Sequence, residues 1–114
     1  MNVICVQVGQ DPYLKEIDNT LSAMQNLVGG FIETVTLKQG LVIVCNEEGK
    51  ILNLPVNKIL KADGYREVIV GDFFIAGVGT DEDGEPDLSS IPEQFIDKII
   101  ENFSLPEINL KNFD

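Results

Sequence analysis

Apolar and polar positions are most clearly patterned in the middle of the chain. Residues 31–37 alternate between apolar and polar side chains, as in a β-strand with one buried face. Residues 41–45 are apolar throughout, which indicates a strand buried on both faces. A short glycine-containing turn joins the two, and a second turn at 46–49 leads to another apolar stretch at 51–54. We therefore predict an antiparallel meander over residues 31–54, against which the rest of the chain packs.

The segments flanking the meander predict an N-terminal strand, two helices and further strand at 67–78, interrupted by a turn or a bulge at Gly71-Asp72. Residues 2–8 are rich in β-branched side chains and predict a buried strand. In residues 12–28, apolar side chains recur every three or four positions after an Asp-Pro start, and glycine follows, which predicts a helix. Ser90 opens a capping-box pattern ahead of a second apolar stripe, which predicts a helix at 91–103.

These elements predict a single α+β domain with a mixed or antiparallel sheet over residues 1–104. Residues 56–60 follow a proline and suit a short helical turn. Residues 79–88 are acidic and interrupted by glycine and proline, which indicates an exposed loop. Residues 105–114 mix apolar and polar positions, so we expect either a loosely docked tail or a partner-binding segment.

The composition supports a cytoplasmic protein with one hydrophobic core. The chain has 114 residues and 44% hydrophobic content, enough for a single core. Its longest apolar runs fall far below the roughly 18 residues of a membrane span, and its apolar start lacks the basic residues of a signal peptide. Cys5 and Cys45 lie in predicted strands, where we expect buried free thiols.

The formal charge of −11 is concentrated in the final third of the chain. Residues 79–114 carry ten acidic and two basic side chains, which gives −8. Direct binding to nucleic acid is disfavoured, because it requires Lys or Arg to replace counterions on the phosphates. Anionic membranes are disfavoured for the same reason. An acidic surface would instead steer the protein toward a basic partner.

The side-chain inventory removes most catalytic systems. With no histidine in the chain, Ser-His and Cys-His nucleophiles and the commonest metal ligand are absent. Glu47 and Glu48 form a carboxylate pair, and Asp72 stands beside a glycine, but a solvated turn does not raise a carboxyl pKa as a general acid requires. We expect no catalytic residues and no cofactor.

Acidic side chains at alternate positions suggest a calcium loop at first sight. The glycine of that motif follows the third acidic position, whereas Gly84 precedes Glu85 here, and no glutamate closes the loop. We therefore expect no metal site. The segment is a candidate acidic surface for a protein partner, formed by Asp81, Glu82, Asp83, Glu85 and Asp87.

Other polar side chains near the meander could converge to hydrogen-bond a small ligand. Turn and capping duties are the competing interpretation for them. The candidates are Tyr13, Asn46, Asn53, Asn57, Lys58, Tyr65 and Arg66.

Several motifs resemble a family of small proteins from phages and conjugative elements of Gram-positive and gut bacteria. They are PYLKEIDNTL at 12–21, VGGFIE at 28–33, CNEEGK at 45–50, the LP-x-N step at 54–57 and the glycine-flanked IVGDFFIAG stretch at 69–77. That family is a domain of unknown function, so the resemblance supplies no catalytic or binding residues. It implies an accessory protein of a mobile element inside a bacterial cell, where small acidic proteins often counter host defence.

Three hypotheses follow. In the leading one, a non-enzymatic protein binds a host bacterial protein through acidic groups, as a counter-defence inhibitor would. In the second, the protein is a sponge for a small nucleotide-like immune signal. The third is an enzyme that uses carboxylates alone or with a metal. A homo-oligomer is compatible with each, because the meander edge and the C-terminal segment could pair across a two-fold axis.

Overall fold

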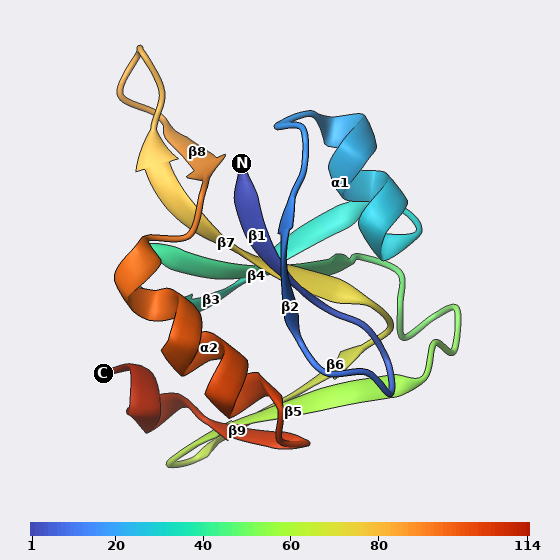
Figure 1. Cartoon of the computed structure of the whole chain (residues 1–114). Helices are drawn as coiled ribbons and strands as arrows, with labels where there is room; N and C mark the ends of the chain where they lie inside the picture. Colours follow the sequence, from blue (N-terminus) through green and yellow to red (C-terminus); the bar gives the residue numbers. More distant parts are fainter.

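Two β-sheets form the framework of the protein in the computed structural model, which describes all 114 residues (Figure 1). The larger one, sheet A, is antiparallel with the strand order β2-β1-β7-β4-β3, and β8 pairs with the far end of β7. Its strands are β1 (Asn2–Val6), β2 (Tyr13–Glu16), β3 (Ile32–Lys38), β4 (Leu41–Asn46), β7 (Phe73–Thr80) and β8 (Pro86–Ser89).

Sheet B has the order β6-β5-β9, and β9 runs parallel to β5. Its strands are β5 (Val56–Ala62), β6 (Tyr65–Val70) and β9 (Glu107–Asn109). The helices are α1 (Leu21–Val28) and α2 (Ile96–Phe103), with 3-10 turns η1 (Glu93–Phe95) and η2 (Leu110–Phe113). The predicted α+β class with antiparallel and mixed sheets is confirmed.

Hydrophobic side chains fill both faces of sheet A. Strand β4 lies between β3 and β7 with all six residues buried, as its apolar run predicts. One face packs against sheet B and α2 around Phe73, Phe103 and Phe113. The other face packs against α1 through Met24 and Val28. The molecule therefore has three layers, and in Figure 1 α1 and α2 lie on opposite sides of the strands of sheet A.

The predicted helix at 12–28 is wrong in its first half. Residues Tyr13–Glu16 form strand β2, which pairs with β1 in the register Ile4↔Leu14. The helix begins only after Thr20, whose Oγ1 accepts a hydrogen bond from the Ala23 N–H at 3.1 Å. Apolar positions in this stretch fit a helix or a strand, and pairing with the open edge of β1 favours the strand. The predicted stop is confirmed: Gly29 has φ 79°.

Two short elements after the meander's second strand also differ from the prediction. Residues 51–54 form turns instead of a strand, and Ile51 is 83% exposed. Residues 56–60, predicted as a helical turn, belong to β5. Strand β5 is the central strand of sheet B, so its ladder bonds to β6 and β9 outweigh the local preference for a turn.

The second helix, predicted at 91–103, ends at the predicted residue, but α2 begins only at Ile96 and lacks the predicted cap. The chain enters it through η1, and no side chain caps that turn. Ser90 Oγ instead accepts a hydrogen bond from the Asn2 N–H at 2.8 Å, which ties the segment before the helix to β1. Both α-helices have eight residues, so neither reaches the length of an apolar membrane-spanning helix.

Residues 105–114, expected as a tail or a binding segment, contribute to the core. Strand β9 places Ile108 inside with 1% exposure, and η2 places Phe113 inside with 2%. The ring of Phe113 lies 6.2 Å from that of Phe103 between centroids. Ile108 and Phe113 therefore close the space between α2 and sheet B.

Candidate functional site

Two of the asparagines expected at a ligand site hold the fold together. Asn46 is buried; its Nδ2 donates to the Val28 carbonyl at 3.2 Å and its Oδ1 accepts from the Glu48 N–H at 2.8 Å. Asn57 Nδ2 donates to the carbonyls of Val6 and Gly71, both at 2.9 Å. The first side chain fixes the end of α1 to β4, and the second joins the two sheets. Both amide groups of Asn46 and the donor group of Asn57 are thus engaged by backbone.

The other candidates for a ligand site lie on separate parts of the molecule. Tyr13 is on the edge strand β2, and Asn53 occupies a turn with φ 58°. Tyr65 and Arg66 are exposed beside the β5–β6 turn. Lys58 lies on β5 with 8% exposure, and burial lowers the pKa of its ammonium group, partly offset by Asp11. The structure does not bring these side chains into one cavity.

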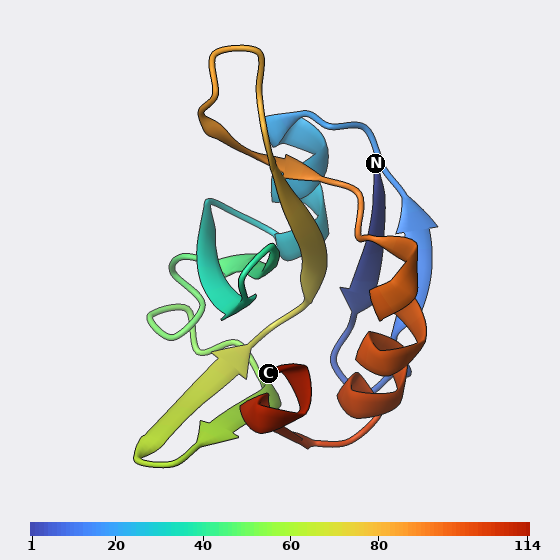
Figure 2. The ribbon, with the colours of Figure 1, turned by 90° about the vertical axis from the view of Figure 1, so that its left-hand side faces the viewer.

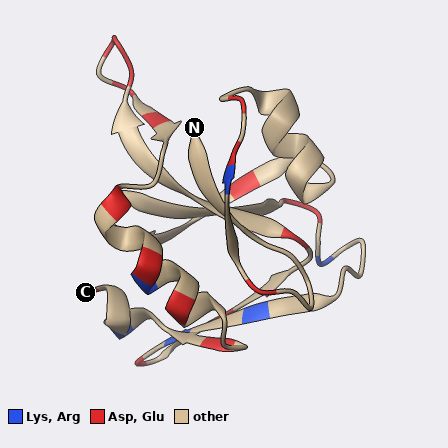
Figure 3. Ribbon diagram, viewed as in Figure 1, with Lys and Arg blue, Asp and Glu red and all other residues tan.

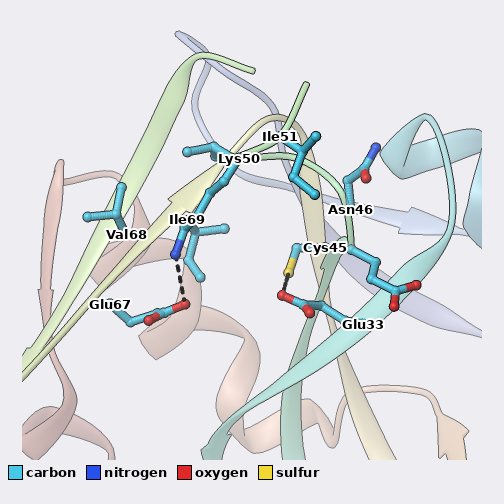
Figure 4. Close-up of a pocket in the computed structure, with 10 residues that line it drawn as sticks. Glu33, Cys45, Asn46, Lys50, Ile51, Glu67, Val68 and Ile69 are labelled. Atoms are coloured by element: carbon cyan, nitrogen blue, oxygen red, sulfur yellow. Dashed lines mark hydrogen bonds and ion pairs between the residues drawn. The ribbon is translucent and has the colours of Figure 1, made fainter. Parts of the chain in front are cut away.

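A small cleft opens between the ends of β3 and β4 and strand β6 (Figure 4). It has a volume of about 70 Å³. Glu33 and Glu67 stand on opposite sides, and Lys50 forms an ion pair with Glu67 at 3.6 Å. The thiol of Cys45 points between them and donates to Glu33 Oε1 at 3.8 Å.

The Cys45 thiol is held in its neutral form. Burial and the neighbouring Glu33 carboxylate raise its pKa to about 12. Because the thiolate is the nucleophilic form, this cysteine is poorly suited to attack a substrate near neutral pH. Cys5, on the α1 face, is also buried, and desolvation raises its pKa. Both thiols are free and buried, as predicted.

The predicted acidic residues come together on one hairpin. Residues 79–88, expected as a loop, include the end of β7 and the start of β8, and the residues from Asp81 to Glu85 form the tip. Asp81 Oδ1 accepts from the N–H groups of Asp83 and Glu85, both at 2.9 Å, and Gly84 has φ 81°. This side chain therefore organises the turn.

The remaining hairpin carboxylates face solvent without a basic partner. They are all exposed, and none takes part in an ion pair. Figure 3 shows the acidic residues at the hairpin tip and along α2, and the two views agree that the hairpin projects beyond the body. The carboxylates that remain available are those of Glu82, Asp83, Glu85 and Asp87.

Two lysines at the opposite end of the molecule are paired with carboxylates. Lys61 Nζ lies 2.7 Å from Glu107 Oε1, and Lys111 Nζ lies 2.7 Å from Asp63 Oδ2. The Lys61 hydrogen bond and charge lower the pKa of the Glu107 carboxyl. These pairs join the β5–β6 hairpin to the C-terminal segment.

The sequence did not predict an apolar groove at the base of the β7–β8 hairpin. This groove has a volume of about 440 Å³ and is lined by residues of β3, β4, β7 and β8. Its lining comes from two hairpins, β3–β4 and β7–β8, that are far apart in sequence, so no local pattern reveals it. The lining residues are Ile32, Thr34, Val42, Val78, Pro86, Asp87 and Leu88.

No group of three or more Cys, Asp or Glu side chains is arranged to hold a metal ion. The candidate site thus consists of the apolar groove and the exposed hairpin carboxylates beside it. No curated protein and no solved structure shows significant similarity to the chain. Among protein families, one matches residues 1–104, and the chain belongs to it: the family described as Domain of unknown function (DUF3846).

Proposed function

We propose that this is a non-enzymatic binding protein that attaches to a basic surface of another protein. The observation that carries the proposal is the β7–β8 hairpin, which presents four exposed carboxylates with no internal counter-charge beside an apolar groove. Charge of one sign on a projecting element speeds encounter with an oppositely charged partner, and apolar area beside it supplies affinity.

The order of the hairpin supports a recognition role. Ladder pairs Gly77↔Ser89 to Thr80↔Pro86 hold its two strands, and Asp81 holds its tip through two hydrogen bonds. Carboxylates on an ordered hairpin lose less conformational freedom on binding than carboxylates on a flexible loop, so more of their interaction energy remains as affinity.

The cellular setting is part of the proposal. The motifs of the chain resemble proteins of phages and conjugative elements, so the partner we propose is a host bacterial protein met in the cytoplasm. A nucleic-acid-binding defence protein has the basic surface that the hairpin requires, and occupying that surface would block it. The protein would then act as a counter-defence inhibitor.

A nucleotide sponge has less support. The cleft between β4 and β6 has a volume of about 70 Å³, well below the roughly 300–1,000 Å³ of typical small-ligand pockets. The apolar groove is larger, but its lining includes Asp87 and no lysine or arginine that could bind a phosphate. The polar residues that could contact a nucleotide are dispersed or bonded to backbone.

The test is affinity capture from a host bacterial lysate with three forms of the protein. One is the wild type; the second, the hairpin variant, carries Glu82→Gln, Asp83→Asn, Glu85→Gln and Asp87→Asn; the third, the charge control, carries Glu47→Gln, Glu48→Gln, Glu93→Gln and Glu101→Gln. Both variants lose the same charge. We expect the wild type and the charge control to retain one partner at about 50 mM salt, and the hairpin variant to lose it. Retention by the hairpin variant would contradict the proposal.

A further inference from the structure

Helix α1 covers only part of the sheet face on which it lies. Its eight residues pack Met24 and Val28 on the cluster that contains Val44 and Phe74. Along the same face, toward the β7–β8 hairpin, no helix continues the layer. The apolar groove occupies this uncovered part, and the floor it exposes includes Val78, which is only partly buried.

The shape of the groove suits side chains of a bound segment. Strands β3 and β4 form one wall and β8 the other, with Val78 of β7 between them. Its volume of about 440 Å³ is in the range of roughly 300–1,000 Å³ in which pockets enclose small ligands, so it has room for a few large apolar side chains. Leu88 and Ile32 are both partly exposed along it.

The charge around the groove selects the occupant. Asp87 lines it, Glu85 stands at the adjacent tip, and no lysine or arginine lines it. A second copy of this chain carries −11 and would be repelled. Nucleic acid and anionic lipid would be repelled for the same reason. A segment with apolar anchor side chains and flanking lysine or arginine is complementary to both the apolar lining of the groove and the carboxylates beside it.

We propose that the groove binds a segment of the partner protein in which one or two large apolar side chains are flanked by basic residues. The apolar side chains contact Val42, Val78 and Leu88, and the basic residues lie along the hairpin carboxylates. This inference rests on the proposed function, since it assigns the place and the chemistry of the contact with the partner.

The test uses two fluorescent basic peptides that differ only in their centre, one with Leu-Phe and one with Ser-Gly. We expect the Leu-Phe peptide to bind the wild type at least about tenfold more tightly, because its centre buries apolar area. Its binding should shift the NMR amide signals of Thr34, Val78 and Leu88. Equal affinities, or shifts elsewhere on the protein, would overturn the proposal. Tighter binding of a DNA duplex or a phosphatidylserine vesicle would also overturn it.

A variant that fills the groove provides the second arm. Thr34→Trp places a large side chain in the groove from an exposed position of the edge strand β3, where aromatic residues are well tolerated. Its control is Leu14→Trp, on the opposite edge strand β2, where Leu14 is 46% exposed. We expect Thr34→Trp to weaken Leu-Phe peptide binding at least about tenfold and Leu14→Trp to leave it unchanged.

The same variants separate this inference from the proposed function. If Thr34→Trp retains the lysate partner while the hairpin variant loses it, the groove assignment is wrong and the proposed function stands. If both retain it, both are wrong. Folding of each variant is checked by its NMR amide spectrum. If Thr34→Trp does not fold, it is replaced by Thr34→Arg, which obstructs the same groove with a charged side chain in place of an apolar one.

Discussion

The two projecting hairpins of this protein use their charged residues in opposite ways. At the β5–β6 end, Lys61 and Asp63 pair with residues of the C-terminal segment, and both pairs have N···O distances of 2.7 Å. At the β7–β8 end, the carboxylates have no cationic partner within the chain. One set of charges therefore joins parts of the fold, and the other remains available to a second molecule.

Polar side chains in the interior, like the charged residues of the β5–β6 hairpin, bond to other groups of the same chain. Asn46, Asn57 and Cys45 are each bonded to groups of the same chain. The difference between internal and external use of polar groups can be tested by substitution, because internal groups contribute to stability and external ones to binding. The expected effects decrease from the core outward.

The largest effect is expected where the C-terminal segment enters the core. Phe113→Ala removes a ring that is 2% exposed and packs on Phe103, so the free energy of unfolding should fall by about 3–5 kcal/mol. Urea denaturation measures it. Leu105→Ala, at a side chain 58% exposed, is the control and should change little. A loss below about 1 kcal/mol for Phe113→Ala would show that the segment is only loosely docked.

A smaller loss is expected at the junction between the sheets. Asn57→Ala leaves the carbonyls of Val6 and Gly71 without their donor, which should lower the free energy of unfolding by about 2 kcal/mol. Asn112→Ala removes one exposed side-chain bond to Asn102 and is the matched control. Equal effects of the two substitutions would refute a joining role for Asn57.

The Cys45 thiol predicts a dependence of stability on pH. Its folded pKa of about 12 lies above its ordinary value of 9.0, so only the unfolded chain releases this proton between those values. Stability from this group is complete well below pH 9 and declines as pH rises toward 12, with a loss of about 1–2 kcal/mol near pH 10. Cys45→Ala should show a flatter decline in urea denaturation across this range. Identical slopes for both proteins would contradict the assignment.

The smallest effect is expected at the paired surface charges. Lys61→Met removes the partner of Glu107, so the pKa of that carboxyl should rise toward its ordinary value in an NMR titration. The melting temperature should fall by no more than about 3 °C, because exposed ion pairs contribute little. A Glu107 pKa that does not move would mean that the pair is absent in solution.

The sequence correctly predicted those elements whose apolar pattern is compatible with only one type of secondary structure. The all-apolar run of β4 and the alternation in β3 led to paired strands, and Gly29 ended α1. The prediction failed where local pattern fits two structures: Tyr13–Glu16 became a strand because β1 offers it an edge, and β5 became a strand between two partners.

The site was predictable only in part, for a physical reason. Contiguous residues such as Asp81 and Asp83 stay together in any fold, so an acidic surface could be predicted from the sequence. An amide side chain has the same donors and acceptors whether it binds a ligand or backbone, so the roles of Asn46 and Asn57 required the structure. The groove required it too, because two hairpins that are distant in sequence assemble it.

The central claim is that the exposed carboxylates of the β7–β8 hairpin bind a basic partner. The salt dependence of Leu-Phe peptide binding tests this claim most directly. For the wild type and the charge control, we expect affinity to fall steeply between about 50 mM and about 200 mM salt, because exposed charges are screened. For the hairpin variant, with Glu82, Asp83, Glu85 and Asp87 neutralised, we expect weak binding that changes little over the same range. Equal affinity and equal salt dependence in all three proteins would contradict the claim.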